Sequence, residues 1–276
     1  MANGSDLGPA PGGAYFAGNA DAAQELARLH FLENLYDPRC QQALVAAGLA
    51  PGMRVLEIGP GAGSMLGWLS DQIGPGGHVT ALDRDPRFLT GFTRPNATVI
   101  TGDIRDIALT DPFDLVFMRF VLMHLPEPVK TLREIANLLR PDGALVAVDL
   151  DMCTHIAAAP WHPGAALFDR RRAALVDALV AGEVMNLNFA RQLGPLIGAA
   201  GLRLEALSYE THLVEGGSDA ALQWRRGSEH TVRALDATGQ ADPGAADFLP
   251  LHDDPDFAFL APLVGTAIAR RCDSPG

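Results

Sequence analysis

The chain has 276 residues, of which 48% are hydrophobic and 20% are charged, and its formal net charge is -12. These values are typical of a globular protein with room for one large domain or two smaller ones. The acidic excess argues against a nucleic-acid partner, because binding to phosphate backbones depends on lysine and arginine. No apolar run is long enough to span a membrane, and the Gly- and Pro-rich beginning lacks the basic and apolar regions of a signal peptide. We therefore expect a cytoplasmic protein that binds neither nucleic acid nor a membrane.

The N-terminal region, residues 1–50, predicts a lid followed by helices. Residues 1–18 are rich in Gly, Pro and Ala without apolar periodicity, so we expect them to become ordered only on a ligand. Asp21 can cap a helix whose apolar residues recur from Leu26 to Leu35, and Pro38 can open a second helix that continues to Leu49. Two helices are therefore expected before the first strand.

The region 51–151 alternates short β-branched runs with helical patterns, which is typical of βαβ units and a parallel sheet. The expected strands are Arg54–Ile58, His78–Asp83, Thr98–Thr101, Asp114–Phe117 and Ala144–Asp149. Helices are expected at Ser64–Ile73 and Val129–Leu139, the second of which is ended by a turn at residues 140–143. The pattern predicts a doubly wound α/β fold.

The region 152–276 is expected to complete the same domain. Helices are expected at Gly164–Gly182 and Phe189–Gly201, and a strand is expected at Arg203–Tyr209. A polar stretch, residues 210–256, separates them from a last apolar run at Phe257–Ala269. We interpret the polar stretch as an insertion over the carboxyl edge of the sheet rather than as a second domain.

A glycine-rich turn gives the strongest local signal. The apolar run Val55–Ile58 leads into Gly59, Gly61 and Gly63, and a helical pattern follows. Glycines permit positive φ and let a ligand approach the backbone at the edge of the sheet where α/β folds bind ligands. Ser64 stands where the dinucleotide fingerprint requires its third glycine, which disfavours an NAD-dependent oxidoreductase. Tight packing of helix on strand is the alternative interpretation of these glycines.

Two acidic residues follow the next strands, at positions from which they could bind the ribose and the adenine of an adenosyl group. Asp83 follows the glycine turn by about 20 residues, the spacing at which a carboxylate reaches ribose hydroxyls. Asp103 can accept the adenine amino group while Ile104 packs on the ring. Asp103 could instead cap a short helix over residues 104–107. These strand ends describe a site for an adenosyl group without a pyrophosphate.

In these motifs the chain resembles class I S-adenosylmethionine-dependent methyltransferases, from about Ala43 to Asp151, and among them small-molecule enzymes of the natural-product type. The matching motifs are, in chain order, VLEIGPGAG, LDRDP, GDIRDI, FDLVFMRFVLMHLPEP and LRPDGALVAVDLD. The resemblance implies a Rossmann-like, doubly wound, seven-stranded, mostly parallel sheet with a helical N-terminal lid and a cap insertion. It implies that residues 51–151 are the cofactor-binding core and that the polar stretch 210–256 caps the substrate. It implies S-adenosyl-L-methionine as cofactor and S-adenosyl-L-homocysteine as product.

The same resemblance implies a set of cofactor-binding residues. Glu57 is expected at the methionine amino group or orienting the loop, and Arg119 is expected to offer its backbone carbonyl. Tyr15 resembles the lid tyrosine of natural-product enzymes, although an ordinary surface aromatic is an equal alternative. The full set is Tyr15, Arg28, Glu57, Gly59, Gly61, Gly63, Asp83, Arg84, Asp103, Ile104 and Arg119.

Catalysis is the least constrained part of the interpretation. Methyl transfer is an in-line displacement that depends on alignment of the nucleophile and exclusion of water, so no general base is obligatory. For a phenol or alcohol, His124, His155 or His162 is a candidate base. Trp161 and Phe168 could line an aromatic pocket, whereas residues 170–172, three arginines, are interpreted as a solvated face.

The sequence therefore predicts a methyltransferase that acts on a small-molecule acceptor in secondary metabolism. It shows no Asn/Asp-Pro-Pro-aromatic tetrad of the nucleobase amino methyltransferases and no clear acidic trio for a divalent metal, so no metal is expected. Cys40, Cys153 and Cys272 lie too far apart to suggest a zinc site or a redox motif. Two alternatives stay open: an enzyme that uses the bound cofactor for a cyclisation or rearrangement, and a non-catalytic cofactor-binding module. A homodimer is also left open.

Overall fold

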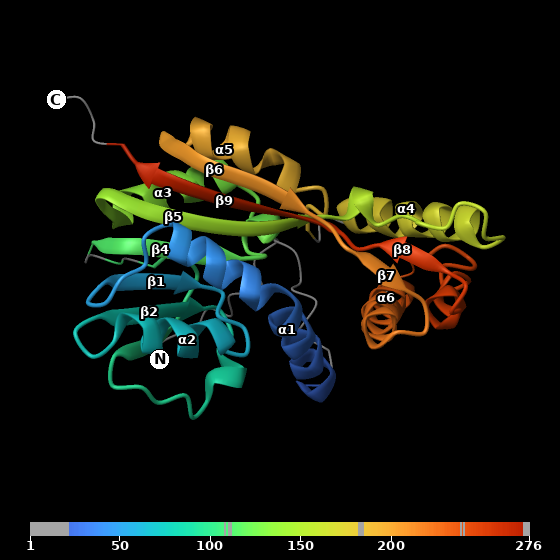
Figure 1. The fold of residues 1–276 in the computed structure, drawn as a ribbon, viewed down its shortest axis with the longest axis horizontal. Coiled ribbons are helices and arrows are strands. Elements are labelled where there is room, and N and C mark those ends of the chain that lie inside the picture. The colour runs from blue at the N-terminus through green and yellow to red at the C-terminus, as the bar shows by residue number, and fades with distance from the viewer. Residues whose placement is uncertain are drawn as a thin grey trace, which may run out of the picture.

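The computed structural model describes residues 22–107, 109, 112–181, 185–237, 239 and 241–272. Its centre is a seven-stranded sheet in the order β3-β2-β1-β4-β5-β9-β6 (Figure 1). The strands are β1 (Arg54–Ile58), β2 (His78–Asp83), β3 (Ala97–Thr101), β4 (Phe113–Arg119), β5 (Leu139–Asp151), β6 (Leu202–Glu210) and β9 (Leu263–Arg271). The pairs among β1 to β5 are parallel, and β9 lies antiparallel between β5 and β6. The expected Rossmann-like, mostly parallel sheet is confirmed.

Helices cover both faces of this sheet, which explains why its central strands are apolar on both sides. One face carries α1 (Ala22–Ala46) and α2 (Ser64–Ile73), and the other carries α3 (Pro128–Leu138) and α5 (Leu193–Ala199) (Figure 1). Successive side chains of β4 alternate between the two layers: Leu115 and Phe117 pack with the α1 and α2 side, and Val116 and Met118 with the α3 and α5 side. This alternation follows from the period of two in a strand.

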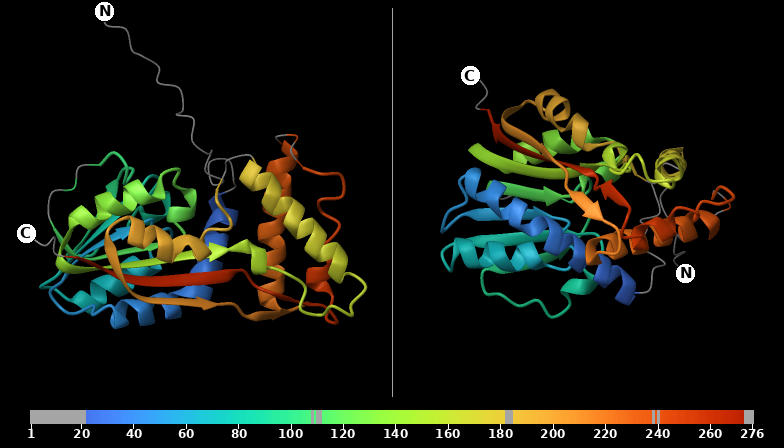
Figure 2. Two further views of the ribbon diagram at one scale, coloured as in Figure 1. Left: turned by 90° about the horizontal axis from the view of Figure 1, so that it is seen from above. Right: turned by 45° about the vertical axis from the view of Figure 1, so that its right-hand side comes forward.

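A second group of elements lies beyond the sheet, at the end toward which β5 runs (Figure 1). It consists of α4 (Ala165–Ala181), β7 (Leu213–Glu215), α6 (Asp219–Ala237), η6 (Leu249–Asp253) and β8 (Ala258–Leu260), and we call it the cap lobe. The strands β7 and β8 pair antiparallel, and α4 and α6 lie side by side (Figure 2). The polar stretch 210–256, which we interpreted as an insertion, contributes β7, α6 and η6 to this lobe, whereas α4 and β8 come from outside it.

Two local expectations from the sequence are wrong. In place of two N-terminal helices, α1 is one helix with Pro38 inside it. Proline removes one backbone hydrogen bond, but Tyr36, Cys40 and Leu44 on either side of it are buried against the sheet and hold the helix together. In place of a turn at residues 140–143, β5 begins directly after α3 and contains a bulge there, with Asp142 at a φ of 58°.

Smaller differences lie in the C-terminal half. The helix expected at Phe189–Gly201 is split into the short turn η5 (Ala190–Gln192) and α5. The last apolar run forms two strands that belong to different sheets, β8 in the cap lobe and β9 in the main sheet. The chain crosses between them at Ala261 and Pro262. Pro262 interrupts this apolar run at the crossing, and it is the sequence signal that the expectation of a single run passed over.

Candidate cofactor and acceptor site

The glycine loop joins β1 to α2 and lies beneath α1. Gly59, Gly61 and Gly63 have φ of 71°, 61° and 94°, which L side chains rarely adopt. A Cβ at Gly63 would stand 2.7 Å from Leu89 Cδ2, so packing as well as conformation requires glycine there. A Cβ at Gly61 would meet Leu29 of α1 at 3.4 Å. Close packing therefore excludes a larger residue at Gly63. At Gly61 the space next to the backbone is bounded by the side chain of Leu29.

Glu57, at the end of β1, is a buried carboxyl group. Its side chain is 2% exposed, and Oε2 has no hydrogen-bond partner within the described part of the chain. Burial raises the pKa of Glu57 to about 8; the Arg119 guanidinium opposes this shift, and the carboxylates of Asp37, Asp83 and Glu33 add to it. Burying an acceptor without a donor costs free energy. A ligand that is cationic or bears an N–H group would supply the missing partner and remove that cost.

Arg119, at the end of β4, has a role that the sequence did not indicate. Its guanidinium forms an ion pair with Asp37 of α1, and both side chains are largely buried. Burial alone would lower the pKa of Arg119, but Cys40, Asp37 and Glu57 together raise it. The expectation concerned only the backbone carbonyl of Arg119. The side chain instead ties α1 to the sheet beside Glu57.

α1 also holds the glycine loop directly. The Ser64 N–H, at the start of α2, donates to Glu33 Oε1 at 3.3 Å, and Glu33 is buried. This carboxylate satisfies one of the free N–H groups that every helix start presents. Glu33 and Asp37 were both missed, because acidic residues on an amphipathic helix are usually solvated, and a contact across 31 residues leaves no local pattern.

Asp83 lies at the end of β2, where the sequence predicts a ribose ligand. Its Oδ1 accepts the Asp85 N–H at 2.9 Å. Burial raises the pKa of Asp83, while the backbone N–H groups of Asp85, Gly61 and Arg84 work against the shift. The approach of the Gly61 N–H places Asp83 at the glycine loop, so the structure brings these two predicted elements together.

Asp103 is occupied by a neighbouring arginine. Arg105 donates to it twice, from Nε to Oδ1 at 2.9 Å and from Nη2 to Oδ2 at 2.6 Å, and Arg84 Nε lies 3.5 Å from Oδ2. The Arg105 hydrogen bond is the main reason that the pKa of Asp103 is lowered. Asp103 Oδ1 also accepts the Arg105 N–H at 3.0 Å, so the capping alternative describes part of its role. Ile104 is buried in the core.

The other lid residues divide between described and undescribed parts of the chain. Tyr15 lies outside the described residues. Arg28, on α1, donates to both carboxylate oxygens of Glu25, at 2.8 and 2.6 Å. Arg28 and Arg84 both lie near enough to His124 to affect its ionisation. The structure thus brings α1, the end of β2 and the turn after β4 to one edge of the sheet.

His124 is the one candidate base at that edge. It lies in the short turn η3 (Leu122–His124) after β4. Burial, helped by the cations of Arg28 and Arg84, lowers the pKa of His124 to about 4. The imidazole is therefore neutral at physiological pH and a weak base.

His155 and His162 belong to a different environment. His155 is 2% exposed, and its ring packs against Trp224, Phe259 and Phe168 of the cap lobe at centroid distances of 5.3, 5.1 and 5.5 Å. Burial holds the pKa of His155 well below its usual value. The nitrogens of His162 are both engaged: Nε2 lies 3.2 Å from Asp254 Oδ2, and Nδ1 accepts the Gly164 N–H at 3.1 Å. This bonding makes His162 a structural residue of the cap lobe.

Two further expectations about side chains change. Trp161 is 81% exposed, so it does not line a pocket, whereas Phe168 is fully buried in the cap lobe. Of the three arginines interpreted as a solvated face, Arg172 is 5% exposed and points into the cap lobe beside Phe248. The helical period places Arg170 outward and Arg172 inward on α4.

Asp149 is a buried acid that the sequence did not single out. It lies in β5 and is 0% exposed, and the backbone N–H groups of Met123 and Leu122 in η3 face its carboxyl group. Burial nevertheless raises the pKa of Asp149 well above its usual value. Neither carboxyl oxygen has a hydrogen-bond partner among the described residues, so Asp149 is a second buried acid, beside Glu57, that lacks a partner, and it lies close to the turn that carries His124.

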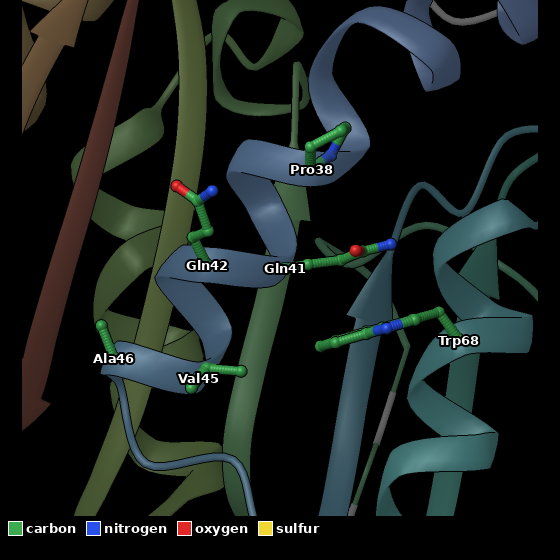
Figure 3. Close-up of a pocket in the computed structure, with 6 residues that line it drawn as sticks. All are labelled: Pro38, Gln41, Gln42, Val45, Ala46 and Trp68. Carbon is green, nitrogen blue, oxygen red and sulfur yellow. The ribbon is translucent and has the colours of Figure 1, made fainter.

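A shallow hollow of about 500 Å³ lies on the outside of the molecule, between α1 and α2 (Figure 3). Its lining residues are Pro38, Gln41, Gln42, Val45, Ala46 and Trp68. They offer amides and an indole but no charged group, so the hollow carries no chemistry of its own. Among the described residues, no group of three or more His, Cys, Asp or Glu side chains could hold a metal ion. No described helix is long and apolar enough to cross a membrane.

The motif-bearing segment matches a known family. Residues 56–147 fit the family model described as a methyltransferase domain (Methyltransf_11), and this segment spans β1 to β5 with the whole glycine loop. The chain carries a class I methyltransferase domain. The family recognised from the sequence motifs is confirmed for this segment, which is a third of the 276 residues.

Curated relatives of the methyltransferase domain match over the same part of the chain. A demethylmenaquinone methyltransferase of Listeria monocytogenes is 31% identical over 106 residues, covering 36% of this chain and 45% of the relative. A ubiquinone/menaquinone biosynthesis C-methyltransferase of Vibrio vulnificus is 28% identical over 112 residues, covering 37% and 43%. This chain thus spans less than half the length of these relatives.

Solved structures resemble nearly the whole chain at low identity. The YcgJ protein of Bacillus subtilis superposes with a TM-score of 0.54 at 18% identity, covering 85% of this chain and 98% of that one. The [4+2]-cyclase SpnF gives 0.51 at 16%, covering 86% and 81%. A Haemonchus contortus phosphoethanolamine N-methyltransferase gives 0.54 at 13%, covering 90% and 58%. At 13 to 18% identity, these superpositions show only that the fold is shared.

Proposed function

We propose that this protein binds S-adenosyl-L-methionine and transfers its methyl group to a small-molecule acceptor. The observation that carries the proposal is the convergence of Glu57, Asp83 and the glycine loop at the carboxyl edge of the sheet, with Glu57 Oε2 buried and unpaired within the described residues. A buried carboxyl group that lacks a partner, and that would ionise beside a cation, suits a ligand with an ammonium group. The motif order of the methyltransferase domain supports the same cofactor.

The proposed contacts follow the positions of the side chains. Glu57 would take the methionine ammonium, Asp83 the ribose hydroxyls and Ile104 the adenine face. Asp103 would accept the adenine amino group only if Arg105 releases one of its carboxylate oxygens. Arg28 of α1 and Arg84 after β2 would border the site near His124, and a role for Tyr15 is proposed from the resemblance alone. When bound, the cofactor supplies a methyl group on a positively charged sulfur.

The acceptor would lie between the carboxyl edge and the cap lobe. α1 reaches from the glycine loop to α6, where Phe31 packs edge-on against Trp224 at 5.7 Å. Closure on that side would exclude water and hold the nucleophile in line, which accounts for most of the rate in a displacement of this kind. The relatives named for quinone methylation support a small aromatic acceptor. The natural-product resemblance supports a role in secondary metabolism.

The same proposal divides the chain by role. Residues 1–50 would form the lid and its helix, residues 51–151 the cofactor-binding core, and residues 152–276 the completion of the sheet with the cap. No step of the reaction requires a protein base in this scheme. His124 would orient the turn after β4, since an imidazole of such low pKa removes protons poorly.

The test is calorimetry with S-adenosyl-L-homocysteine, followed by transfer from a methyl-labelled cofactor. A naphthoquinol, a simple phenol and an amine would serve as acceptors, with acceptor-free protein as the control. Binding of the homocysteine product with label appearing in one acceptor is the expected result. Binding with unlabelled but rearranged acceptor would favour the cyclisation alternative, and binding without any chemistry would favour the non-catalytic module. Absence of binding would contradict the proposal.

A further inference from the structure

The interior of the cap lobe contains buried polar groups that the methyl-transfer site does not use. Arg172, Ser228, His155 and His252 are all at most 5% exposed. They come from α4, α6, the segment after β5 and η6, so four separate parts of the chain bring them together. Buried polar side chains are ordinarily fully hydrogen-bonded.

These groups are instead short of partners. Arg172 Nη1 donates to Ser228 Oγ at 3.2 Å, and its guanidinium lies 5.7 Å from the centre of the Phe248 ring, but Nε has no acceptor in the described residues. Both ring nitrogens of His155, of which one carries a proton, and Trp224 Nε1 likewise have no hydrogen-bond partner in the described residues. Several N–H groups therefore lie in an apolar interior with no acceptor given to them by the described chain.

The charge of Arg172 is also uncompensated. No carboxylate of the described residues forms an ion pair with it, although most other arginines of the chain have one. Burial lowers the pKa of Arg172 to about 10, so the group is still protonated at neutral pH. A buried cation without an anion is strongly unfavourable unless binding of a ligand provides one.

Aromatic rings connect this cation to the cofactor side of the molecule. Phe31 of α1 contacts Trp224 of α6, and Trp224 contacts His155 at 5.3 Å. His155 in turn packs on Phe168, one turn before Arg172 on α4. Phe168 also contacts Phe248, over which the Arg172 guanidinium lies, so the path from α1 to the positive charge is a series of packed rings.

We propose that Arg172 binds a carboxylate of the acceptor, whose aromatic body lies along the path from Trp224 to Phe168. The guanidinium fork matches a carboxylate in geometry and charge, and the surrounding rings strengthen the interaction by excluding water. The inference rests on the proposed methyl transfer, and it narrows the acceptor to an aromatic acid. Because the rings pack against one another in the structure, the acid must part them on entry, and Trp224 lies at the entrance between α1 and His155.

The first experiment compares two probes that differ only in charge. Benzoate and benzamide share a ring and a size, and only benzoate carries a negative charge. Calorimetry on the full chain with bound S-adenosyl-L-homocysteine is expected to show benzoate binding about tenfold or more tightly than benzamide. Equal affinities, or no binding of benzoate, would overturn the proposal.

The second experiment uses a matched pair of variants on one helix. Arg172→Met removes the buried cation, and Arg170→Met makes the same change at an exposed position. Arg172→Met is expected to abolish the preference for benzoate and to raise the melting temperature of the probe-free protein, because an uncompensated buried charge is replaced by an apolar side chain. Arg170→Met should do neither. Unchanged benzoate affinity in Arg172→Met would overturn the inference.

A structural role for Arg172 predicts the opposite change in stability. If the contacts with Ser228 and Phe248 were its purpose, Arg172→Met would lower the melting temperature. Arg172→Lys is the second variant, because it keeps the charge without the planar fork and should retain part of the preference. The affinity for S-adenosyl-L-homocysteine, measured in every variant, separates the two proposals. If the wild-type protein did not bind S-adenosyl-L-homocysteine, the proposed methyl transfer would be refuted. If it bound this product but did not prefer benzoate, only the acid-binding role of Arg172 would be refuted.

Discussion

At the scale of single residues, the molecule places ionisable groups where water does not reach them. Glu57, Asp149 and Arg172 are buried, and each has a pKa moved by that burial. Such shifts concentrate at binding sites, because a ligand can supply the missing partner. Motifs identified Glu57. The burial of Asp149 and Arg172 could not be predicted from the sequence. An aspartate in a strand, or an arginine in a run of three, has the same local pattern whether it is buried or solvated.

Asp83→Ala is expected to weaken binding of S-adenosyl-L-homocysteine by about 1–3 kcal/mol, because ribose hydroxyls would lose a charge-assisted hydrogen bond. Asp85→Ala is the matched control: its carboxylate pairs with Arg87 near the surface, and its backbone N–H to Asp83 is kept. Calorimetry would measure both. A dissociation constant that is the same in wild type and Asp83→Ala would remove Asp83 from the site.

Glu57 predicts a pH dependence of stability. Its pKa rises from an ordinary 4.5 to about 8 on folding, so between these values the folded state binds more protons than the unfolded state. The free energy of unfolding contributed by this group therefore falls as the pH rises from about 4.5 toward 8. Glu57→Gln should flatten that slope, as measured by urea unfolding at several pH values, and should weaken cofactor binding. An unchanged slope would mean that Glu57 is ionised in the fold.

At the scale of elements, α1 joins the glycine loop to the sheet and the cap lobe. Glu33 accepts from the start of α2, Asp37 pairs with Arg119, and Phe31 contacts Trp224. Most residues of α1 could be predicted as helical from the sequence, but as two helices separated before Pro38. The division followed from a local rule, and the buried contacts of Tyr36, Cys40 and Leu44 with the sheet override it.

Asp37→Ala should destabilise the protein by about 1–3 kcal/mol, because it leaves the Arg119 guanidinium largely buried without its anion. The expected loss is below that of a fully buried pair, since both side chains keep some contact with water. Asp71→Ala, which removes an exposed pair with Arg94, is the control and should change stability by about 0.5 kcal/mol or less. Urea unfolding would measure the free energy of unfolding of both variants. Equal losses would mean that the pair of Asp37 with Arg119 does not anchor α1 to the sheet.

At the scale of the whole molecule, the sheet and the cap lobe share one hydrophobic cluster. It runs from Leu132 of α3 and Val116 of β4 to Phe168, Phe248 and Phe259 of the cap lobe. The mostly parallel sheet and the bounds of β1 to β3 could be predicted, because apolar strands and glycine turns leave local patterns in the sequence. The cap lobe could not, because β7 and β8 pair across more than forty residues of a stretch that looks polar.

Phe168→Ala should therefore lower the stability of the entire chain, by about 3–5 kcal/mol, since it opens a cavity in a cluster that both parts share. The indole of Trp68 reports on the sheet, and that of Trp224 on the cap lobe. Variants with one of these tryptophans replaced by Phe should show coincident unfolding curves with and without the Phe168 substitution. Two separated transitions, with only the Trp224 signal shifted, would indicate a cap lobe that unfolds by itself.

The position of β9 has a consequence for biosynthesis. This strand lies between β5 and β6, yet it follows both in the sequence, with residue 144 paired to residue 270. During synthesis from the N-terminus, β5 and β6 must wait with unpaired edges until the last strand leaves the ribosome. Exposed edges invite pairing with other chains, and contacts so distant in sequence form slowly. A ribosome-bound chain from which β9 has not yet emerged should therefore bind chaperones, whereas emergence of the nine residues of β9 allows the sheet to close.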